Sequence, residues 1–177
     1  METVVVSDTN IFIDLYDVGL LNEFFSMDIQ VHTTDFIINE LTVEDQKRSV
    51  LDFADRLYIK KFTADELVNL FAFQQKKQKD TNVSIQDCSV WSYAQENDYT
   101  LLTGDGKLRK SAIKEGTRVR GILYLFDKMV SDGIISPYKA SEKIQQLRSK
   151  NGRLPSKEID KRIELWNKQE TKQDNIK

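Results

Sequence analysis

Short apolar segments recur along the chain and predict five β-strands. Val4, Val5 and Val6 form an unbroken β-branched run, which is typical of a central parallel strand covered on both faces. A second segment alternates polar and apolar positions around Ile29 and Val31, as expected of a strand. Together with three further apolar segments, the predicted strands are residues 3–7, 28–32, 57–62, 100–103 and 119–122.

Helices are predicted between these strands and after the last one, because apolar residues recur there at helical spacing behind capping residues. Thr63 and Ser84 each stand three positions before an acidic residue, which is the spacing of a capping box. Pro137 and Pro155 suit the first turn of a helix. The predicted helices begin at Ile11, cover 36–41 and 43–56, follow Thr63 and Ser84, cover 107–115, 122–133 and 136–150, and begin again at Pro155.

Strands and helices alternate five times, which predicts an α/β fold with a parallel sheet and helices on both of its faces. Only 7 Gly and 2 Pro occur among the 177 residues, which excludes collagen-like and linker-like chains. The 40% share of apolar residues also excludes a disordered chain and provides for a hydrophobic core.

The small numbers of cysteine and histidine residues exclude several kinds of site, and the lack of a long apolar run excludes a membrane span. Cys88 is the only cysteine and His32 the only histidine, which excludes an internal disulfide, a cysteine-based zinc site and a multi-histidine metal site. We expect Cys88 to be a buried, unreactive thiol and His32 to be structural. No apolar run approaches the roughly 18 residues of a membrane span, so we expect a soluble, cytoplasmic protein.

Charge is distributed unevenly, although the net charge is only −2. Residues 139–177 hold 11 Lys and Arg against 6 Asp and Glu, whereas the rest of the chain is acidic. A basic edge on an acidic body suits contact with a polyanion, and a solvated C-terminal helix gives the same composition. Charge alone therefore does not decide the function.

Four acidic residues occupy positions at or near the predicted strand ends. Asp8 ends the first strand, and Asp105 follows the fourth strand by two residues. Glu40 lies on the helix after the second strand, and Asp87 lies in the first turn of the helix before the fourth. Because ligands of open parallel sheets bind at the carboxyl ends of the strands, we expect these four carboxylates to converge on one edge.

A cluster of this kind predicts a cation. Two carboxylates about 5 Å apart repel by about 3 kcal/mol at an effective dielectric of about 20. Clustered acids therefore imply a bound metal ion or strongly raised pKa values. Oxygen ligands without His or Cys select hard cations such as Mg²⁺ or Mn²⁺, which suit phosphoryl chemistry.

Each acid taken singly also has a structural interpretation. Asp8 suits a helix N-cap, Asp87 a capping box with Ser84, and Asp105 a turn between two glycines, while Glu40 suits a solvated helix surface. Their order and their shared position at strand ends favour a functional site over four separate structural roles.

Three stretches and one single residue follow one another along the chain: VVVSDTN from Val4, DFIINEL from Asp35, Asp87, and LLTGDGKLR from Leu101. In this order they resemble the PIN-domain nucleases, which include the VapC-type toxins of toxin–antitoxin systems. The resemblance covers about residues 3–148 and implies a three-layer α/β/α fold with a mostly parallel five-stranded central sheet and a helical C-terminal extension. We accordingly divide the chain into a PIN-like nuclease domain, 1–148, and a basic helical extension, 149–177.

The resemblance implies a Mg²⁺- or Mn²⁺-dependent endoribonuclease. Its metal ligands or water-orienting carboxylates would be Asp8, Glu40, Asp87 and Asp105, and the supporting polar residues would be Thr9, Asn10 and Thr103. The partners it implies are an RNA substrate, a second copy of the chain in a homodimer and, if the protein is a toxin, an antitoxin.

A group of basic residues near the same edge, Lys107, Arg109 and Lys110, suits contacts with neighbouring phosphates and equally suits a solvated helix face.

Two other functions fit parts of the pattern. A phosphotransferase of the haloacid dehalogenase type also begins with an Asp after the first strand, but it needs a second Asp where this chain has Asn10. The stronger alternative is a catalytically silent PIN-like module that binds RNA or a protein. The set of four acids argues against that alternative, because pure binding gains nothing from mutually repelling carboxylates.

Overall fold

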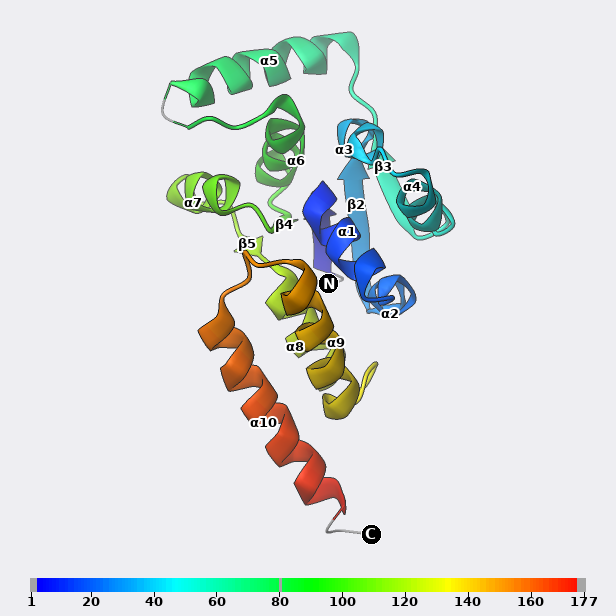
Figure 1. The fold of residues 1–177 in the computed structure, drawn as a ribbon. Coiled ribbons are helices and arrows are strands. Elements are labelled where there is room, and N and C mark those ends of the chain that lie inside the picture. Colours follow the sequence, from blue (N-terminus) through cyan, green and yellow to red (C-terminus); the bar gives the residue numbers. More distant parts are fainter. Residues whose placement is uncertain (1–2, 80, 175–177) are drawn as a thin grey trace. The chain divides into compact units, whose positions relative to one another are not determined.

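The computed structural model describes residues 3–79 and 81–174, and all five predicted strands are present in it. They form one sheet in the order β3-β2-β1-β4-β5, and every pairing between its strands is parallel (Figure 1). The sheet places β1 at the centre, as its apolar run predicts. The strands are β1 (Thr3–Ser7), β2 (Ile29–Thr34), β3 (Leu57–Lys60), β4 (Thr100–Leu102) and β5 (Val119–Arg120).

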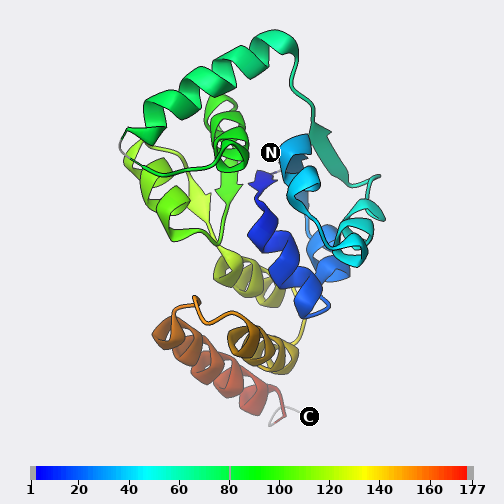
Figure 2. The ribbon, with the colours of Figure 1, turned by 45° about the horizontal axis from the view of Figure 1, so that its top comes forward.

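Helices connect the strands and lie on both sides of the sheet, so the predicted α/β fold with three layers is confirmed (Figures 1 and 2). The helices are α1 (Thr9–Asp17), α2 (Leu21–Ser26), α3 (Asp35–Glu40), α4 (Glu44–Leu51), α5 (Ala64–Gln78), α6 (Ile85–Glu96), α7 (Gly106–Lys114), α8 (Ile122–Ser131), α9 (Pro137–Lys150) and α10 (Ser156–Asp174). Among the described helices, none combines the length and the apolar character needed to cross a membrane.

The chain packs as two compact units. The first comprises Met1–Ile13 and Asp28–Ile122 and contains the sheet, and the second comprises Asp14–Met27 and Leu123–Lys177. This grouping describes packing. The division into a nuclease domain, 1–148, and an extension, 149–177, stays a prediction.

Two local differences from the predicted elements have clear physical causes. β2 continues to Thr34 rather than ending at residue 32, because Thr33 and Thr34 are buried and their hydroxyls find partners inside the protein. Gly19, at φ +67°, separates the first helix from a second short helix, α2, that the pattern did not predict. Leu21, Phe24 and Phe25 of that helix are buried.

The core of the first unit lies around β1, β4 and α6. Val5 and Val6 of β1 and Leu101 and Leu102 of β4 are fully buried. Cys88 of α6 is also fully buried, which confirms its expected burial, and burial raises the pKa of its thiol to about 12, as expected of an unreactive thiol. These residues form the apolar interior of a sheet covered by helices.

The second unit contains a hairpin of α9 and α10, which run side by side in opposite directions (Figures 1 and 2). Trp166 of α10 is buried and stacks on Phe126, with ring centroids 6.3 Å apart. Arg162 donates two hydrogen bonds from Nε and one from Nη2 to the Asp127 carboxylate, at 2.8 to 3.0 Å. The predicted basic helix is therefore anchored to α8 by both an aromatic and an ionic contact.

A buried lysine joins three helices of the first unit. Lys77 of α5 is only 8% exposed and forms an ion pair with Glu115, directly after α7. Its ammonium group lies 4.8 Å from the ring centroid of Phe73 and 4.9 Å from that of Trp91 of α6. The aromatic faces and the carboxylate together offset the cost of burying this charge.

We expect Lys77→Ala to lower the free energy of unfolding by about 2 kcal/mol, because it removes a buried ion pair and two cation–π contacts. Lys76→Ala, one position earlier on the exposed side of α5, is the matched control and should change it by less than about 0.5 kcal/mol. Urea denaturation of the three proteins measures both values. Equal stabilities of the two variants would contradict a structural role for the Lys77 contacts.

Candidate functional site

The carboxyl ends of three neighbouring strands gather the predicted site residues. β1 lies between β2 and β4, so the segments that follow these strands leave the sheet at the same edge. The Asp8 N–H donates to the Leu102 carbonyl at 3.0 Å, and the Thr103 N–H donates to the Arg120 carbonyl at 3.0 Å. The backbone ladder therefore continues past the strand ends and fixes the positions of Asp8 and Thr103.

Asp8 is a buried acid with both carboxylate oxygens hydrogen-bonded. Its Oδ1 accepts from the Ile11 N–H at 3.1 Å, so the structural role as an N-cap is real. Its Oδ2 accepts from the Thr103 hydroxyl. The pKa of Asp8 is raised to about 7, mainly by burial and also by the nearby Asp87 carboxylate, although these hydrogen bonds lower it.

Thr103 links Asp8 to the next acid. The Thr103 hydroxyl oxygen accepts a hydrogen bond from the Asp105 N–H at 3.0 Å, and the same hydroxyl donates a hydrogen bond to Asp8 Oδ2. Asp105 is half-buried, and its Oδ1 accepts from the N–H groups of Lys107 at 2.8 Å and Leu108 at 2.7 Å. Asp105 is thus the N-cap of α7, and one threonine hydroxyl connects it with the buried Asp8.

Glu40 is the exposed last residue of α3, and the Thr9 hydroxyl donates to its Oε2. The helix that carries Glu40 is positioned by Thr34, whose hydroxyl accepts from the Ile37 N–H at 3.4 Å. The same Thr34 hydroxyl lies 2.7 Å from the Ser89 hydroxyl of α6. A buried pair of hydroxyls therefore ties the helix of Glu40 to the helix of Asp87.

Asp87 stands in the predicted capping box with Ser84 at the start of α6. Its Oδ2 accepts from the Ser84 N–H at 3.1 Å, and its own N–H donates to the Ser84 hydroxyl at 3.0 Å. Burial raises the pKa of Asp87, and repulsion from the Asp105 and Glu40 carboxylates raises it further. Because Asp87 also acts on Asp8, all four predicted acids share one electrostatic neighbourhood.

The donor chemistry of this neighbourhood fits a hard cation, since it consists of carboxylate oxygens that repel one another. As the side chains stand, no group of three or more Asp, Glu, His or Cys residues in the described part of the chain could hold a metal ion. Each of the four carboxylates instead accepts a hydrogen bond from a nearby residue. Glu40, Asp87 and Asp105 each accept through one carboxylate oxygen, so lone pairs remain for coordination, and binding an ion would require the acidic side chains to move closer together.

The remaining predicted residues lie close to the acids along the chain. Asn10 follows Thr9 at the start of α1. A Cβ added to Gly104 would lie 3.4 Å from the Cβ of Asn10. The small glycine therefore lets the turn before Asp105 approach α1 closely. The predicted phosphate contacts stand exposed on α7, and they are Lys107, Arg109 and Lys110.

Sequence reasoning missed the role of three buried hydroxyls, Thr33, Thr34 and Ser89. Thr33 donates to the Ser7 carbonyl at 2.8 Å, directly before Asp8. The pair Thr33-Thr34 stands out in the sequence only as cap residues, although two adjacent β-branched polar residues after an apolar strand are a sign of buried hydrogen bonding. Ser89 gives no such sign.

Comparisons with known proteins agree with this architecture. A family model described as a PIN domain matches residues 4–168. No curated protein matches the chain.

Several solved structures are similar to it at low sequence identity. PAE2754 from Pyrobaculum aerophilum is 12% identical, with 74% of this chain and 99% of that chain covered and a TM-score of 0.55. VapBC2 from Rickettsia felis, bound to a DNA fragment from the VapBC2 promoter, is 18% identical, with 67% and 98% covered and a TM-score of 0.47. VapBC-1 from nontypeable Haemophilus influenzae is 14% identical, with 67% and 98% covered and a TM-score of 0.49.

The family match spans most of the chain and includes the four acids, the sheet apart from Thr3, all of α9 and most of α10. It agrees with the resemblance that the motifs indicate. The chain belongs to the PIN-domain family.

Proposed function

We propose that this protein is a metal-dependent ribonuclease that hydrolyses RNA phosphodiester bonds with Mg²⁺ or Mn²⁺. Membership of the PIN-domain family supports a hydrolase that acts on nucleic acid. The observation that carries the proposal is the position of Asp87. Its pKa is raised by burial and also by the carboxylates of Asp105 and Glu40, and its own charge raises the pKa of Asp8.

The repulsion among these acids argues for a cationic ligand. The charged groups that act most strongly on Asp8 and Asp87 are other carboxylates rather than lysine or arginine. Such an arrangement costs folding free energy in the free protein, and a divalent cation offsets that cost. A protein surface that neither binds a metal ion nor catalyses a reaction would gain nothing from a cluster of mutually repelling carboxylates.

In this proposal Asp8, Asp87 and Asp105 hold the ion, and Glu40 holds a second ion or orients the attacking water. When bound, the ion lowers the pKa of water and stabilises the negative charge that develops on the phosphate. Thr103 fixes the relative positions of Asp8 and Asp105 through its two hydrogen bonds. Thr9 orients Glu40 through the hydrogen bond to Oε2.

Substrate contacts complete the proposed site. Lys107, Arg109 and Lys110 are exposed on the helix that Asp105 caps, which suits them to contact phosphates on either side of the scissile bond. Because these contacts are electrostatic, RNA affinity should fall as salt concentration rises. Asn10, beside Thr9 and next to the turn at Gly104, would support the loop that carries Asp105.

The proposal includes two protein partners, an antitoxin and a second copy of the chain. Both rest on the family, whose members include VapC-type toxins. The alternative is a silent PIN-like module that binds RNA or protein without cleavage, and the carboxylate cluster weighs against it.

The raised pKa of Asp8 predicts a pH-dependent stability in the metal-free protein. The pKa of this acid rises from an ordinary 3.8 to about 7 on folding, so its ionisation is less favourable in the folded state than in the unfolded state. The free energy of unfolding therefore falls as the pH rises from 3.8 to about 7. Asp8→Asn removes the charge and loses part of the local hydrogen bonding. We expect the variant to be more stable than the native protein by about 1 to 2 kcal/mol at pH 8 and not at pH 4.

Urea denaturation in EDTA at both pH values measures this difference. Asp65→Asn is the matched control, because Asp65 is exposed in the first turn of α5. A stability difference between native and Asp8→Asn that stays constant from pH 4 to pH 8 would contradict a buried, repelled Asp8 carboxylate.

Cleavage of total tRNA and of a long single-stranded RNA tests the proposed activity directly. We expect native protein to cut in Mg²⁺ or Mn²⁺ and not in EDTA. Asp8→Asn, made from the same preparation scheme, should lose at least about 100-fold in rate, because it removes a proposed metal ligand whose partner positions stay intact. Asp65→Asn should cut at the native rate.

The outcomes separate the competing functions. Cutting that survives in Asp8→Asn would identify a contaminating nuclease. Absence of cutting, together with a melting temperature that Mn²⁺ leaves unchanged, would favour the silent binding module.

A further inference from the structure

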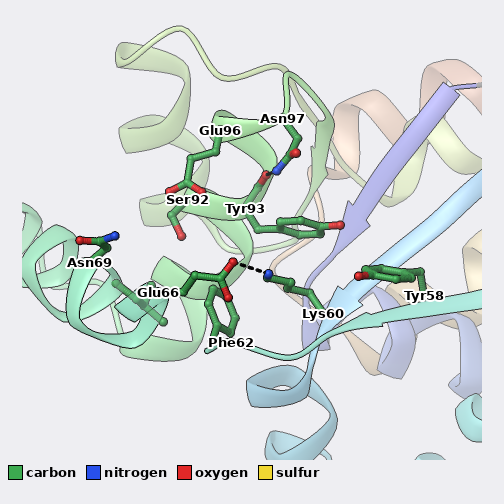
Figure 3. A pocket seen from close by; sticks show the side chains of 10 residues that line it. Tyr58, Lys60, Phe62, Glu66, Asn69, Ser92, Tyr93, Glu96 and Asn97 are labelled. Atoms are coloured by element: carbon green, nitrogen blue, oxygen red, sulfur yellow. Dashed lines mark hydrogen bonds and ion pairs between the residues drawn. The ribbon is translucent and has the colours of Figure 1, made fainter. Parts of the chain in front are cut away.

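A hollow lies in the first unit, apart from the four acids. It has a volume of about 460 Å³ and is formed by β3, α5 and α6, with none of the four acids among its lining residues (Figure 3). This volume is within the range of about 300 to 1,000 Å³ that small-molecule sites occupy. The hollow is therefore large enough for a ligand of the size of a nucleoside.

The hollow exists because β3 is an edge strand of the sheet. Helix α6 packs against β1, β2 and β4, and α5 packs against α6, so the residues of β3 form an open side. Tyr58 of β3 is 54% exposed there, and its ring centroid lies 4.7 Å from that of the neighbouring His32. An exposed tyrosine ring supported from behind is a surface on which a flat ligand can stack.

A second ring of the hollow is held in place by the same histidine. Tyr93 of α6 is buried except for 9% of its surface, its ring lies parallel to that of His32 at 6.0 Å, and its hydroxyl is 2.9 Å from His32 Nδ1. Phe62 packs edge-on against Phe36, with centroids 5.7 Å apart. The aromatic walls are thus fixed before any ligand arrives, which reduces the entropy lost on binding.

The polar groups of the hollow include two carboxylates, the amides of Asn69 and Asn97, and the hydroxyl of Ser92. Lys60 is already paired with Glu66 at 2.6 Å, and this contact keeps the pKa of Glu66 below its ordinary value (Figure 3). Glu96 adds a second carboxylate, and Asn97 donates its Nδ2 to the Tyr93 carbonyl at 2.9 Å, which leaves its amide oxygen as an acceptor. With one cation against two carboxylates, the hollow disfavours phosphate.

We propose that this hollow binds an unpaired nucleobase that carries an exocyclic amino group, stacked on Tyr58. The stacking surface suits any base, and carboxylate and amide oxygens accept from the amino groups of cytosine and adenine. This inference rests on the proposed function, because the base would belong to the same single-stranded RNA that the acids cut.

Helix α6 connects the hollow to the acid cluster. Asp87 lies in the first turn of α6 and Tyr93 six residues later, a rise of about 9 Å along the helix. A strand with about 3.4 Å between stacked nucleotides covers that distance in a few nucleotides. A base held in the hollow would therefore fix which phosphate of the RNA reaches the acids, and so contribute to the choice of cleavage position.

Binding of short labelled cytidylate and uridylate oligonucleotides of equal length, measured by fluorescence anisotropy in EDTA, tests the proposal without cleavage. The two bases match in size and differ at position 4, amino against carbonyl, and at N3, acceptor against N–H donor. Because only cytosine offers an amino group to the acceptors of the hollow, native protein should bind cytidylate several-fold more tightly. Tyr58→Ala should weaken cytidylate binding about 10-fold or more, whereas Tyr58→Phe should retain it. Glu96→Gln should reduce the preference for cytidylate over uridylate.

Phe71→Ala is the matched control, because Phe71 is an aromatic residue of α5 that is 50% exposed and does not line the hollow. Equal binding of the two oligonucleotides, or the same affinity for Tyr58→Ala and Phe71→Ala with unchanged melting temperatures, would overturn the proposal and leave a protein segment as the better occupant. Base-selective binding in a protein that never cuts with Mg²⁺ or Mn²⁺ would support the base site and reject the nuclease.

Discussion

The parallel pairing of β1 with both β2 and β4 is the constraint on which the rest of the first unit depends. It makes three strand ends leave the sheet at one edge, and it buries Asp8 where water cannot solvate its charge. Burial raises the pKa of Asp8, and the segments that follow β2 and β4 bring further acids into the same field. The site is thus a product of topology, because no single local motif would create this repulsion.

Hydroxyl groups provide the precision that the sheet alone does not. Thr103 joins Asp8 to Asp105, Thr9 holds Glu40, and the contact of Thr34 with Ser89 ties two acid-bearing helices together. Threonine suits this work, because its β-branched side chain packs in or beside a strand while its hydroxyl both donates and accepts. The carboxylates are therefore held by neutral partners, which leaves their charge uncompensated for a cationic ligand.

Much of this architecture could be predicted from the sequence. The apolar run at Val4 to Val6, the capping boxes and the four acids at strand ends each depend on local chemistry that a single chain displays. The separate helix after Gly19 and the continuation of β2 through Thr34 depend on tertiary burial, which outweighs local polarity. The hollow beside Tyr58 could not be predicted, because it arises from the space that α5 and α6 leave beside the edge strand β3.

The two edge strands of the sheet, β3 and β5, also affect the tendency of the protein to aggregate at high concentration. An edge strand offers unpaired backbone groups to any other extended chain, and long, flat, uncharged edges promote aggregation. Here β5 is two residues long, and β3 ends at Lys60, whose charge is held at the edge by Glu66. Neither edge offers a long uncharged template, so the same open border that leaves room for a ligand is poorly suited to seeding intermolecular β-sheet.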